Sequence, residues 1–341
     1  MRAAESLLAR QGFAGSEACA QCHPAIHASY AKTAMRAALL RPGSDLALGT
    51  KGNVAGNVGA AAYTITPAAG GAYTYGVRFH GQQLEAPIGW AFGLGSAGQT
   101  YILEHQGALY ESRVSFYDSI KALDLTIGAA NAAPTKLIDA AGRKMSEADI
   151  RECFGCHALG VPRTGKASLE GIELGVGCEN CHGPAAMHVA ARRGSDLKSG
   201  RMPPLRNQEA EEISQLCGRC HRTWEDVVSL RIRGVNNVRF QPYRLTLSRC
   251  YDSREQRISC VACHNPHENV VTDAASYDGR CQSCHAARAP EPRPASLACK
   301  SGHTANCTSC HMPKRELPGA HRAFTDHYIR VHRAGEPYPD L

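Results

Sequence analysis

The sequence predicts a mostly irregular fold with short α-helices and a small antiparallel β insertion near residues 61–117. Three observations predict this fold class. The pentapeptide Cys-x-x-Cys-His occurs seven times, and aromatic residues make up only 6% of the 341 residues while Gly (33) and Pro (18) are frequent. Apolar and small or polar residues alternate with a period of two in parts of residues 61–117, as in strands with one buried face. Each pentapeptide is expected on a short helix.

The seven pentapeptides point to one chemistry. Two thiolates at positions i and i+3 lie on one side of a helical turn and can form thioethers to the edge of a porphyrin, while the next imidazole binds the iron as proximal ligand. The attachment cysteines are Cys19, Cys22, Cys153, Cys156, Cys178, Cys181, Cys217, Cys220, Cys260, Cys263, Cys281, Cys284, Cys307 and Cys310. The proximal histidines are His23, His157, His182, His221, His264, His285 and His311. The sequence therefore predicts seven covalently bound haem c groups with short α-helices packed around them.

Chance and zinc are the competing explanations of the pentapeptides. Random placement of 16 Cys and 16 His would give roughly 0.04 such pentapeptides in the chain. Structural zinc sites use Cys-x-x-Cys pairs two at a time and need no His after each pair. Because the number of pentapeptides is odd and every one carries the His, haem is the better explanation.

Two cysteines, Cys250 and Cys299, lie outside the pentapeptides. Haem attachment to c-type cytochromes takes place outside the cytoplasm, where disulfides are permitted. Three alternatives stay open for this pair: a Cys250–Cys299 disulfide, two buried thiols, or a haem ligand or reactive thiol.

The spacing of the pentapeptides predicts the organisation of the chain. Six of them lie between Cys153 and His311, so the porphyrins must supply much of the buried apolar area, and the protein without haem is not expected to fold. Residues 1–40 form a first haem-binding segment with a helix near residues 24–40, and residues 41–145 a loop followed by the β-rich insertion. Residues 146–341 form a hexahaem domain with a ligand-bearing tail, and Ser146 is expected to begin the helix that leads into it.

Residues outside the pentapeptides can provide the second axial ligands. Nine other histidines exceed the seven irons, which permits six-coordinate haems of the kind that carry electrons. His267 follows His264 by three residues, and each residue spans at most ~3.5 Å. This length is too short for the chain to pass round the rim of a porphyrin to its other face, so His267 is expected to ligate a neighbouring haem. His188 is assigned to a neighbour by the same argument, and Met35 is a candidate thioether ligand.

Several longer stretches resemble bacterial multihaem c-type cytochromes of the type often fused to tetratricopeptide repeats. They are Gly98-Gln99-Thr100-Tyr101, Glu111-Ser112-Arg113-Val114-Ser115, Gly177-Cys178-Glu179-Asn180-Cys181-His182-Gly183-Pro184, Arg239-Phe240-Gln241-Pro242-Tyr243-Arg244-Leu245, Cys263-His264-Asn265-Pro266-His267-Glu268, Cys310-His311-Met312-Pro313-Lys314 and Phe324-Thr325-Asp326-His327. The resemblance runs from Cys19 to about Arg330. No helical repeat array follows the last motif, so partner binding through such repeats is not carried over.

The resemblance implies a secreted electron-transfer cytochrome. Met35, His188, His267, His321 and His327 occupy positions that look like those of axial ligands in the family, and Cys250 looks like a recurring feature. The sixth ligands of two further haems are not indicated by the resemblance. His105 and His303, together with His80, are candidates for them by availability alone.

The net charge of +7 does not indicate a nucleic-acid partner. Each haem brings two propionates, so many of the Lys and Arg side chains are expected to pair with them. No apolar segment is long enough to span a membrane, and residues 1–15 lack the apolar stretch of an export signal. Because haem attachment requires export, the expectation is a periplasmic or extracellular protein whose signal has been removed or mis-annotated.

Two functions fit these observations. The leading interpretation is a heptahaem c-type cytochrome that carries electrons along a closely packed haem chain between redox partner proteins, with self-association into haem-continuous assemblies. On this interpretation the protein is an electron-transfer protein more than an enzyme. The alternative is a multihaem oxidoreductase of small nitrogen or sulfur compounds, with one five-coordinate haem near Tyr243, Arg244 and Arg249.

Overall fold

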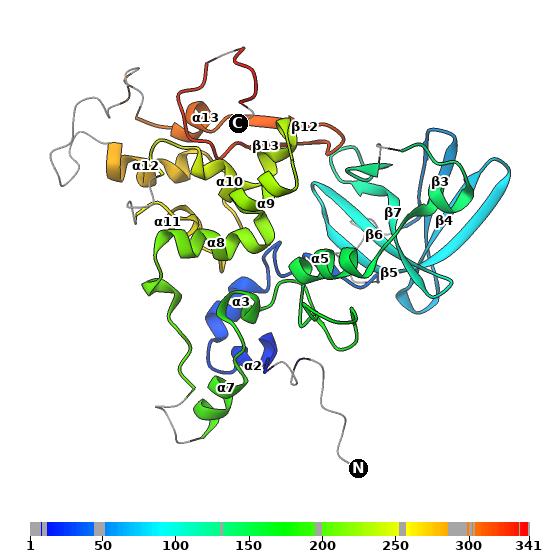
Figure 1. Ribbon diagram of the computed structural model, residues 1–341, viewed down its shortest axis with the longest axis horizontal. Coiled ribbons are helices and arrows are strands. Elements are labelled where there is room, and N and C mark those ends of the chain that lie inside the picture. The colour runs from blue at the N-terminus through cyan, green and yellow to red at the C-terminus, as the bar shows by residue number, and fades with distance from the viewer. Residues whose placement is uncertain are drawn as a thin grey trace. The chain divides into compact units, whose positions relative to one another are not determined.

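The chain forms two compact units (Figure 1). The computed structural model describes residues 8, 12–43, 52–129, 132–194, 200–251, 257–285, 299, 302, 304–333 and 335–339. The first unit comprises Met1–Pro203 with Pro318–Arg322, and the second comprises Pro204–Leu317 with Ala323–Leu341. Each unit is described separately below.

An antiparallel sheet dominates the first unit, and nine strands of the described residues take part in it. The main path runs in chain order through β2 (Val54–Val58), β3 (Ala61–Pro67), β4 (Tyr73–Phe79), β5 (Gln82–Gly95), β6 (Gly98–His105), β7 (Ala108–Tyr117) and β8 (Ala122–Leu125). Two short strands lie off this path, β1 (Leu39–Leu40) beside β5 and β9 (Gly142–Lys144) beside β7. Every strand therefore pairs with a neighbour close to it in sequence, except at β1 and β9.

The sheet curls until its two ends meet. The 14-residue strand β5 pairs with β4 through its first half and with β6 through its second, and bulges after Ile88 and after Phe92 bend it between these partners. Gly93, in the second bulge, has φ +79°, a conformation that favours glycine. At the ends of the path, a Cβ added to Gly56 of β2 would lie 3.4 Å from the Cβ of Leu123 in β8. The result is a nearly closed sheet.

The alternating sequence fills the inside of this sheet. Tyr63 and Ile65 of β3 and Tyr75, Val77 and Phe79 of β4 are buried, while Thr64 and Arg78 between them are more exposed. The short helix α4 (Leu137–Ala141) packs on the same cluster. A second apolar cluster joins β5 and β6 to the helix α5 (Glu147–His157). The first unit thus has a core made of protein side chains.

Helix α5 begins where the sequence predicted. The Ser146 hydroxyl accepts the amide of Asp149 at 3.1 Å, and the Asp149 carboxylate accepts the amide of Ser146 at 2.8 Å. The remaining elements of the first unit are short: α2 (Ser16–Ala20), α3 (Pro24–Tyr30), η1 (Ala69–Gly71), β10 (Ala158–Leu159), β11 (Glu173–Leu174), α6 (Cys178–His182) and α7 (Ala186–Arg193). Helix α3 ends at Tyr30, so the helix expected up to residue 40 is too long.

The second unit consists of short helices and one two-stranded sheet. Its elements are η3 (Leu205–Asn207), α8 (Ala210–His221), α9 (Trp224–Ser229), η4 (Gly234–Arg239), α10 (Gln241–Thr246), α11 (Cys260–Cys263), η5 (Ala275–Tyr277), α12 (Asp278–His285), α13 (Cys307–His311), β12 (Lys314–Leu317) and β13 (Arg322–Thr325). Strands β12 and β13 pair with each other. Long connections without regular structure separate some of these helices, as between Cys263 and Ala275.

The expected fold class is wrong for the chain as a whole. Antiparallel strands are present over residues 61–117, but they belong to a large, nearly closed sheet that extends from β1 to β9 and has its own core. The second unit does consist of short helices with a two-stranded sheet, but the chain as a whole is not of that class. The low overall aromatic content was misleading because the aromatic residues are concentrated in the sheet, where Tyr63, Tyr75 and Tyr101 are fully buried.

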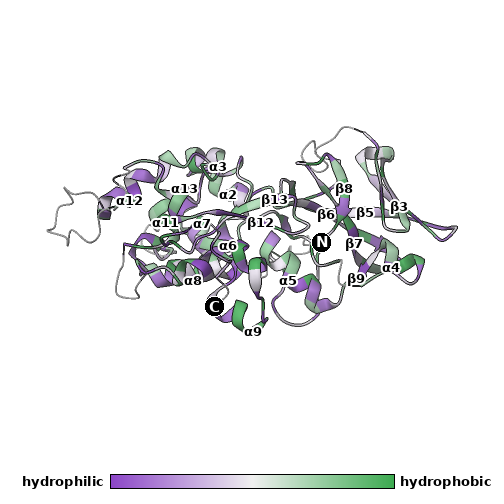
Figure 2. Cartoon of the chain, turned by 90° about the horizontal axis from the view of Figure 1, so that it is seen from above, coloured by the Kyte–Doolittle hydropathy of each residue, from purple (hydrophilic) through white to green (hydrophobic). Residues whose placement is uncertain are grey.

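No helix in the described part of the chain combines the length and the apolar character needed to cross a membrane. Figure 2 shows polar and apolar residues interspersed along the helices and strands.

Candidate haem attachment sites

Each Cys-x-x-Cys-His motif lies on or beside a short helix, as its chemistry requires. Four motifs form the end or the whole of a helix through the histidine, in α5, α6, α8 and α13, and a fifth ends α12. The other two follow the same course: α11 ends at Cys263 and α2 ends one residue after Cys19, with the histidine just beyond. A helical turn places the two thiols of each motif on one side.

Four histidines share a hydrogen bond that orients the ring. In each of them Nδ1 lies within hydrogen-bond distance of a backbone carbonyl oxygen. The pairs are His157 with Ala38 (3.0 Å), His188 with Gly200 (3.0 Å), His311 with Arg330 (2.9 Å) and His327 with Thr325 (3.0 Å). A carbonyl oxygen only accepts, so Nδ1 carries the proton and the lone pair is on Nε2. This is the orientation that ligating histidines need.

His264 and His327 are placed as a pair of ligands on one iron would be. Their ring centroids are 6.2 Å apart. An imidazole nitrogen binds a metal at about 2 Å and the ring centroid lies about 1 Å further, so two imidazoles on opposite sides of one metal have centroids about 6 Å apart. Burial lowers the pKa of both histidines, to about 4 in His327, which keeps the rings in the neutral form that binds metal. The pair fits a haem attached at Cys260 and Cys263.

The other expected ligands lie in varied surroundings. His321 has Nε2 at 2.7 Å from Asp124 Oδ2 and packs edge-on against Tyr117, so its Nε2 would have to leave the carboxylate to bind iron. His267 is half-buried, and its amide donates to Asn265 Oδ1. His105 packs against Tyr110 at 6.2 Å.

Met35 and His303 complete the expected set. Met35 lies beyond the end of α3, half-buried, and its carbonyl accepts the amide of Val176 at 3.1 Å, two residues before Cys178. His303 lies outside the described residues.

The first cysteines of the first and third motifs meet in the first unit. The Cys19 thiol is in hydrogen-bond contact with the Cys178 thiol, and burial together with this neighbour raises its pKa to about 12. The Ser16 hydroxyl accepts the amide of Cys178 at 3.0 Å. The buried Glu179 carboxylate accepts the amides of Gly15 at 2.8 Å and Ala185 at 2.6 Å. These contacts hold the first and third motifs side by side although they lie far apart in the sequence.

The same contact occurs twice in the second unit. A hydrogen bond from the Cys217 thiol is the main reason that the pKa of Cys260 is lowered to about 7, and α8 and α11 pack together. The Cys281 and Cys307 thiols are likewise in hydrogen-bond contact. The Asp278 carboxylate accepts the amide of Cys307 at 2.8 Å. Sequence reasoning missed the polar residues that make these contacts.

The second motif is built on the sheet of the first unit. Phe154, between Cys153 and Cys156, is fully buried and packs edge-on against Trp90 at 5.4 Å and Phe92 at 5.0 Å. The His157 ring lies 4.9 Å from the Phe92 ring. Asn180, between the cysteines of the third motif, donates to the carbonyl of Ala158 at 3.1 Å. The second motif is therefore joined to both the sheet and the third motif.

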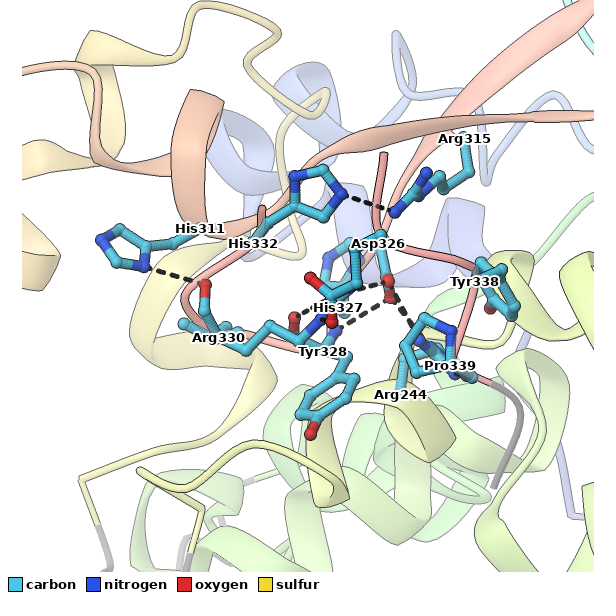
Figure 3. A network of polar contacts seen from close by, with 12 residues as sticks. Arg244, His311, Arg315, Asp326, His327, Tyr328, Arg330, His332, Tyr338 and Pro339 are labelled. Atoms are coloured by element: carbon cyan, nitrogen blue, oxygen red, sulfur yellow. Dashed lines mark hydrogen bonds and ion pairs between the residues drawn. The ribbon is translucent and has the colours of Figure 1, made fainter. Parts of the chain in front are cut away.

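A buried ion-pair network holds the segment that carries His327 (Figure 3). Arg244 binds both carboxylate oxygens of Asp326, at 2.8 Å and 2.9 Å, and both side chains are fully buried. Arg330 reaches the same carboxylate at 3.2 Å. Asn237 and the carbonyl of Pro339 accept further N–H groups of Arg244.

The position of Arg244 in this network bears on the alternative function, an oxidoreductase with a five-coordinate haem near Tyr243, Arg244 and Arg249. Arg244 and Tyr243 are buried in the network and its surroundings, whereas Arg249 is exposed. Because Arg244 already binds Asp326, Asn237 and Pro339, it supports the His327 segment and does not present its guanidinium to a substrate. The three residues do not form a common binding site.

Several buried guanidinium groups of the second unit have N–H groups that suit haem propionates. Among the described side chains, Arg239 Nε, Arg315 Nε and Arg330 Nη2 are buried and make no hydrogen bond. Buried donors of this kind need an acceptor, and a carboxylate is the group that guanidinium binds best. Together with the oriented histidines and the paired cysteines, they fit covalently attached haem.

The structure also bears on the two cysteines outside the motifs and on the zinc explanation of the motifs. Cys250 is half-buried, and burial is the main cause that raises its pKa, with the neighbouring Cys281 and Cys284 thiols adding to it. Cys299 is exposed, and the structure has no disulfide between Cys250 and Cys299. Within the described ranges, no group of three or more His, Cys, Asp or Glu side chains is arranged to hold a metal ion, as a structural zinc site would be.

Comparisons with known proteins agree with this geometry. The family model described as cytochrome c554 and c-prime matches residues 120–183, which include the second and third motifs. Cytochrome c-554 of Nitrosomonas europaea (strain ATCC 19718 / CIP 103999 / KCTC 2705 / NBRC 14298) is 31% identical over 85 residues, which are 22% of this chain and 36% of that protein. The match thus spans about a third of the relative's length.

A solved structure resembles the whole fold. The crystal structure of the outer cell wall cytochrome OcwA has a TM-score of 0.55 and 14% sequence identity, with 94% of this chain and 80% of that chain covered. At this identity the similarity concerns the fold alone. The family model and the relative confirm the resemblance to multihaem c-type cytochromes, an electron-transfer family with covalently bound haem c, that the motifs indicated, and the solved structure supports the fold.

Proposed function

We propose that the chain is a heptahaem c-type cytochrome that carries electrons along a closely packed haem chain, outside the cytoplasm, between redox partner proteins. All seven motifs have the same uninterrupted spacing, and each is on or beside a short helix. One haem on each motif accounts for fourteen of the sixteen cysteines. The relative and the family model support haem c in general, and the number seven rests on the motifs.

The meeting of attachment cysteines is the observation that carries the proposal. Haems joined to touching sulfur atoms cannot be far apart, because each thioether sits at a porphyrin edge. In the second unit the contacts run from Cys217 to Cys260 and from Cys281 to Cys307, and the Cys281 thiol contributes to the raised pKa of Cys263. Four neighbouring haems would therefore follow one another in this unit.

In the first unit the Cys19–Cys178 contact and the Asn180–Ala158 hydrogen bond join all three motifs. Three neighbouring haems would follow one another there. We further propose that electrons pass between these two groups of haems. By self-association, electrons would also pass from one copy of the protein to the next. The single chain of haems expected from Cys153 to His311 remains part of the proposal too.

Second ligands complete the proposed sites. We assign His327 to the haem at Cys260 and Cys263 on its distance from His264, and His188 to a neighbouring haem on its oriented ring. His267, His321 and Met35 keep their proposed roles, and His105 and His303 are proposed for the haems that remain. The role of these side chains is to hold the irons six-coordinate, while the haem supplies the one-electron chemistry.

The location is proposed from the chemistry of attachment. Covalent haem c is assembled outside the cytoplasm, and the solved structure that resembles the fold is described as an outer cell wall cytochrome. The proposal is a periplasmic or extracellular protein.

Mass spectrometry and electron paramagnetic resonance of the holoprotein test the function. The protein is produced with a haem-attachment system, and seven covalent haems with wholly low-spin ferric signals are expected. Six or fewer haems on fully matured protein would refute the count. A high-spin signal that shifts with nitrite, sulfite or hydroxylamine would refute the pure electron carrier and favour an oxidoreductase with a five-coordinate haem.

His327→Ala tests the proposed ligand pair, with His332→Ala as the matched control. His332 is a histidine of the same segment whose Nε2 contacts Arg315 at 2.7 Å. A high-spin signal is expected in the first variant only. An unchanged low-spin spectrum in His327→Ala, or the same signal in both variants, would refute the assignment.

A further inference from the structure

Three motifs share a buried polar residue three positions before the first cysteine. These residues are Ser16 before Cys19, Ser214 before Cys217 and Asp278 before Cys281. All three are buried, with 2%, 5% and 8% of their surface exposed. Buried polar side chains are normally held by hydrogen bonds, so the partners of these side chains are informative.

Each of these side chains reaches a different motif from its own. The Ser16 hydroxyl accepts the amide of Cys178 at 3.0 Å. The Asp278 carboxylate accepts the amides of Cys307 at 2.8 Å and Asn306 at 2.7 Å. The buried Ser214 hydroxyl makes no hydrogen bond of normal geometry, but it is close enough to the Cys260 thiol to lower the pKa of that thiol. For Ser16 and Asp278 the hydrogen-bond partner is the first cysteine of another motif or the residue just before it, and for Ser214 the neighbour is again the first cysteine of another motif.

The same motifs are those whose first thiols touch. Cys19 meets Cys178, Cys217 meets Cys260 and Cys281 meets Cys307. The other four motifs carry Ile150, Gly175, Arg257 and Thr304 at the equivalent position. Of these, only Thr304 has a hydroxyl, and it is exposed. A buried Ser or Asp at this position therefore marks the first member of each pair.

We propose that Ser16, Ser214 and Asp278 are positioning residues that select which motifs pair and hold the two haems of each pair in contact. The side chain lies one helical turn before its own cysteine, so it projects beside that cysteine and captures the start of the partner motif. A captured amide fixes the partner cysteine, and through it the edge of the partner haem. This inference rests on the proposed packed-haem function and adds the residues that determine the packing.

The test uses the fully haem-loaded protein and two spectroscopic readouts. Haems in contact give a split circular dichroism signal in the Soret band, and spin-coupled ferric haems have broadened paramagnetic resonance signals. Ser16→Ala and Asp278→Ala are each expected to lose one pair's contribution to the Soret couplet and to release two resolved low-spin signals, with haem content unchanged. Thr304→Ala, the matched control at the equivalent position, is expected to keep both signals of the wild type.

Conservative variants separate positioning from general stability. Ser16→Thr keeps the hydroxyl and Asp278→Asn keeps an acceptor oxygen, so both are expected to retain the couplet, while Ser16→Val, which has the shape of Thr without the hydroxyl, is expected to lose it. If the alanine variants do not accumulate as holoprotein, the Thr and Val variants decide. Retention by Thr with loss by Val supports the proposal, and equal behaviour of the two, including failure of both to accumulate, overturns it.

The spectra of the wild-type protein distinguish failure of the packed-haem function from failure of the assigned positioning residues. If it shows no coupled haems, the packed-haem function itself fails. If it shows coupled haems but Ser16→Ala and Asp278→Ala keep them, or Thr304→Ala loses them equally, only the assignment of positioning residues fails.

Discussion

The two units solve the problem of a hydrophobic core in different ways. Both apolar clusters among the described residues lie in the first unit, where strands β3 to β7 bury Tyr, Val, Ile and Phe side chains. The second unit buries a polar network around Arg244 and Asp326, and it leaves large apolar side chains exposed. These exposed side chains are Trp224, Val228, Leu230, Val261, Val270, Val271 and Val331.

This difference indicates what each unit needs in order to fold. The first unit buries apolar area in two clusters, whereas the second also buries apolar side chains such as Val238, Tyr243 and Leu245 but forms no comparable cluster among the described residues. Val261, between Cys260 and Cys263, is 47% exposed in the described chain. On the proposed function, a porphyrin attached to those cysteines would cover it, and haem would then complete the core of the second unit.

Removal of haem is expected to reveal the largest difference in stability between the two units. Protein made without haem attachment should keep slow amide exchange in β3 to β7 and lose it in α8 to α13, because both apolar clusters among the described residues lie in the first unit. Hydrogen exchange with mass spectrometry measures both regions in one sample. Equal protection of the two regions, or loss of protection in the sheet alone, would contradict the interpretation.

Arg244→Met in the holoprotein should have the next largest effect. It leaves the buried Asp326 carboxylate without its bidentate partner, which typically costs about 3–5 kcal/mol of unfolding free energy. Arg143→Met is the control in the first unit, where a guanidinium that is 54% exposed pairs with Glu111 and Asp149 and should contribute less than about 1 kcal/mol. Denaturant titration compares them, and similar losses would show that the network is not the second unit's structural centre.

Phe154→Leu tests how far the second motif depends on the sheet. The smaller side chain keeps apolar contact but loses the edge-on packing with Trp90 and Phe92, and a loss of about 1–2 kcal/mol is expected. Val261→Ala is the control between the cysteines of a motif in the second unit. It should change the unfolding free energy of protein without haem by less than about 0.5 kcal/mol, because the second unit is expected to lack stable structure in that state and Val261 is exposed even in the folded chain. A loss as large as that of Phe154→Leu would contradict the comparison.

The smallest expected effect concerns the start of α5. Burial alone would raise the pKa of Asp149, but hydrogen bonds from Ser146 and the ion pair with Arg143 lower it to about 2. Since the pKa is lower in the folded state, this carboxylate stabilises the fold above about pH 4 and loses that contribution as the pH falls toward 2. Ser146→Ala should cost about 1 kcal/mol at neutral pH, with a smaller difference from wild type near pH 2. A difference that does not change with pH would refute the assignment.

The local parts of this protein could be predicted from the sequence alone. The short helices at or beside the pentapeptides were expected from the sequence, and the attachment of haem to their cysteines and histidines stays a prediction. The antiparallel strands near residues 61–117 follow from their alternation, and the start of α5 at Ser146 follows from the polar residues of its capping box. Each of these features depends on residues close together in the chain.

Only the tertiary structure decided how the local parts combine. The nearly closed sheet depends on β2 meeting β8 and on the bulges in β5, and the contact of Cys19 with Cys178 joins residues far apart in sequence. The place of His327 beside His264 depends on a buried ion pair between Arg244 and Asp326. Loop lengths and periodicity do not specify such pairings, because many distant partners satisfy the same local pattern and packing selects among them.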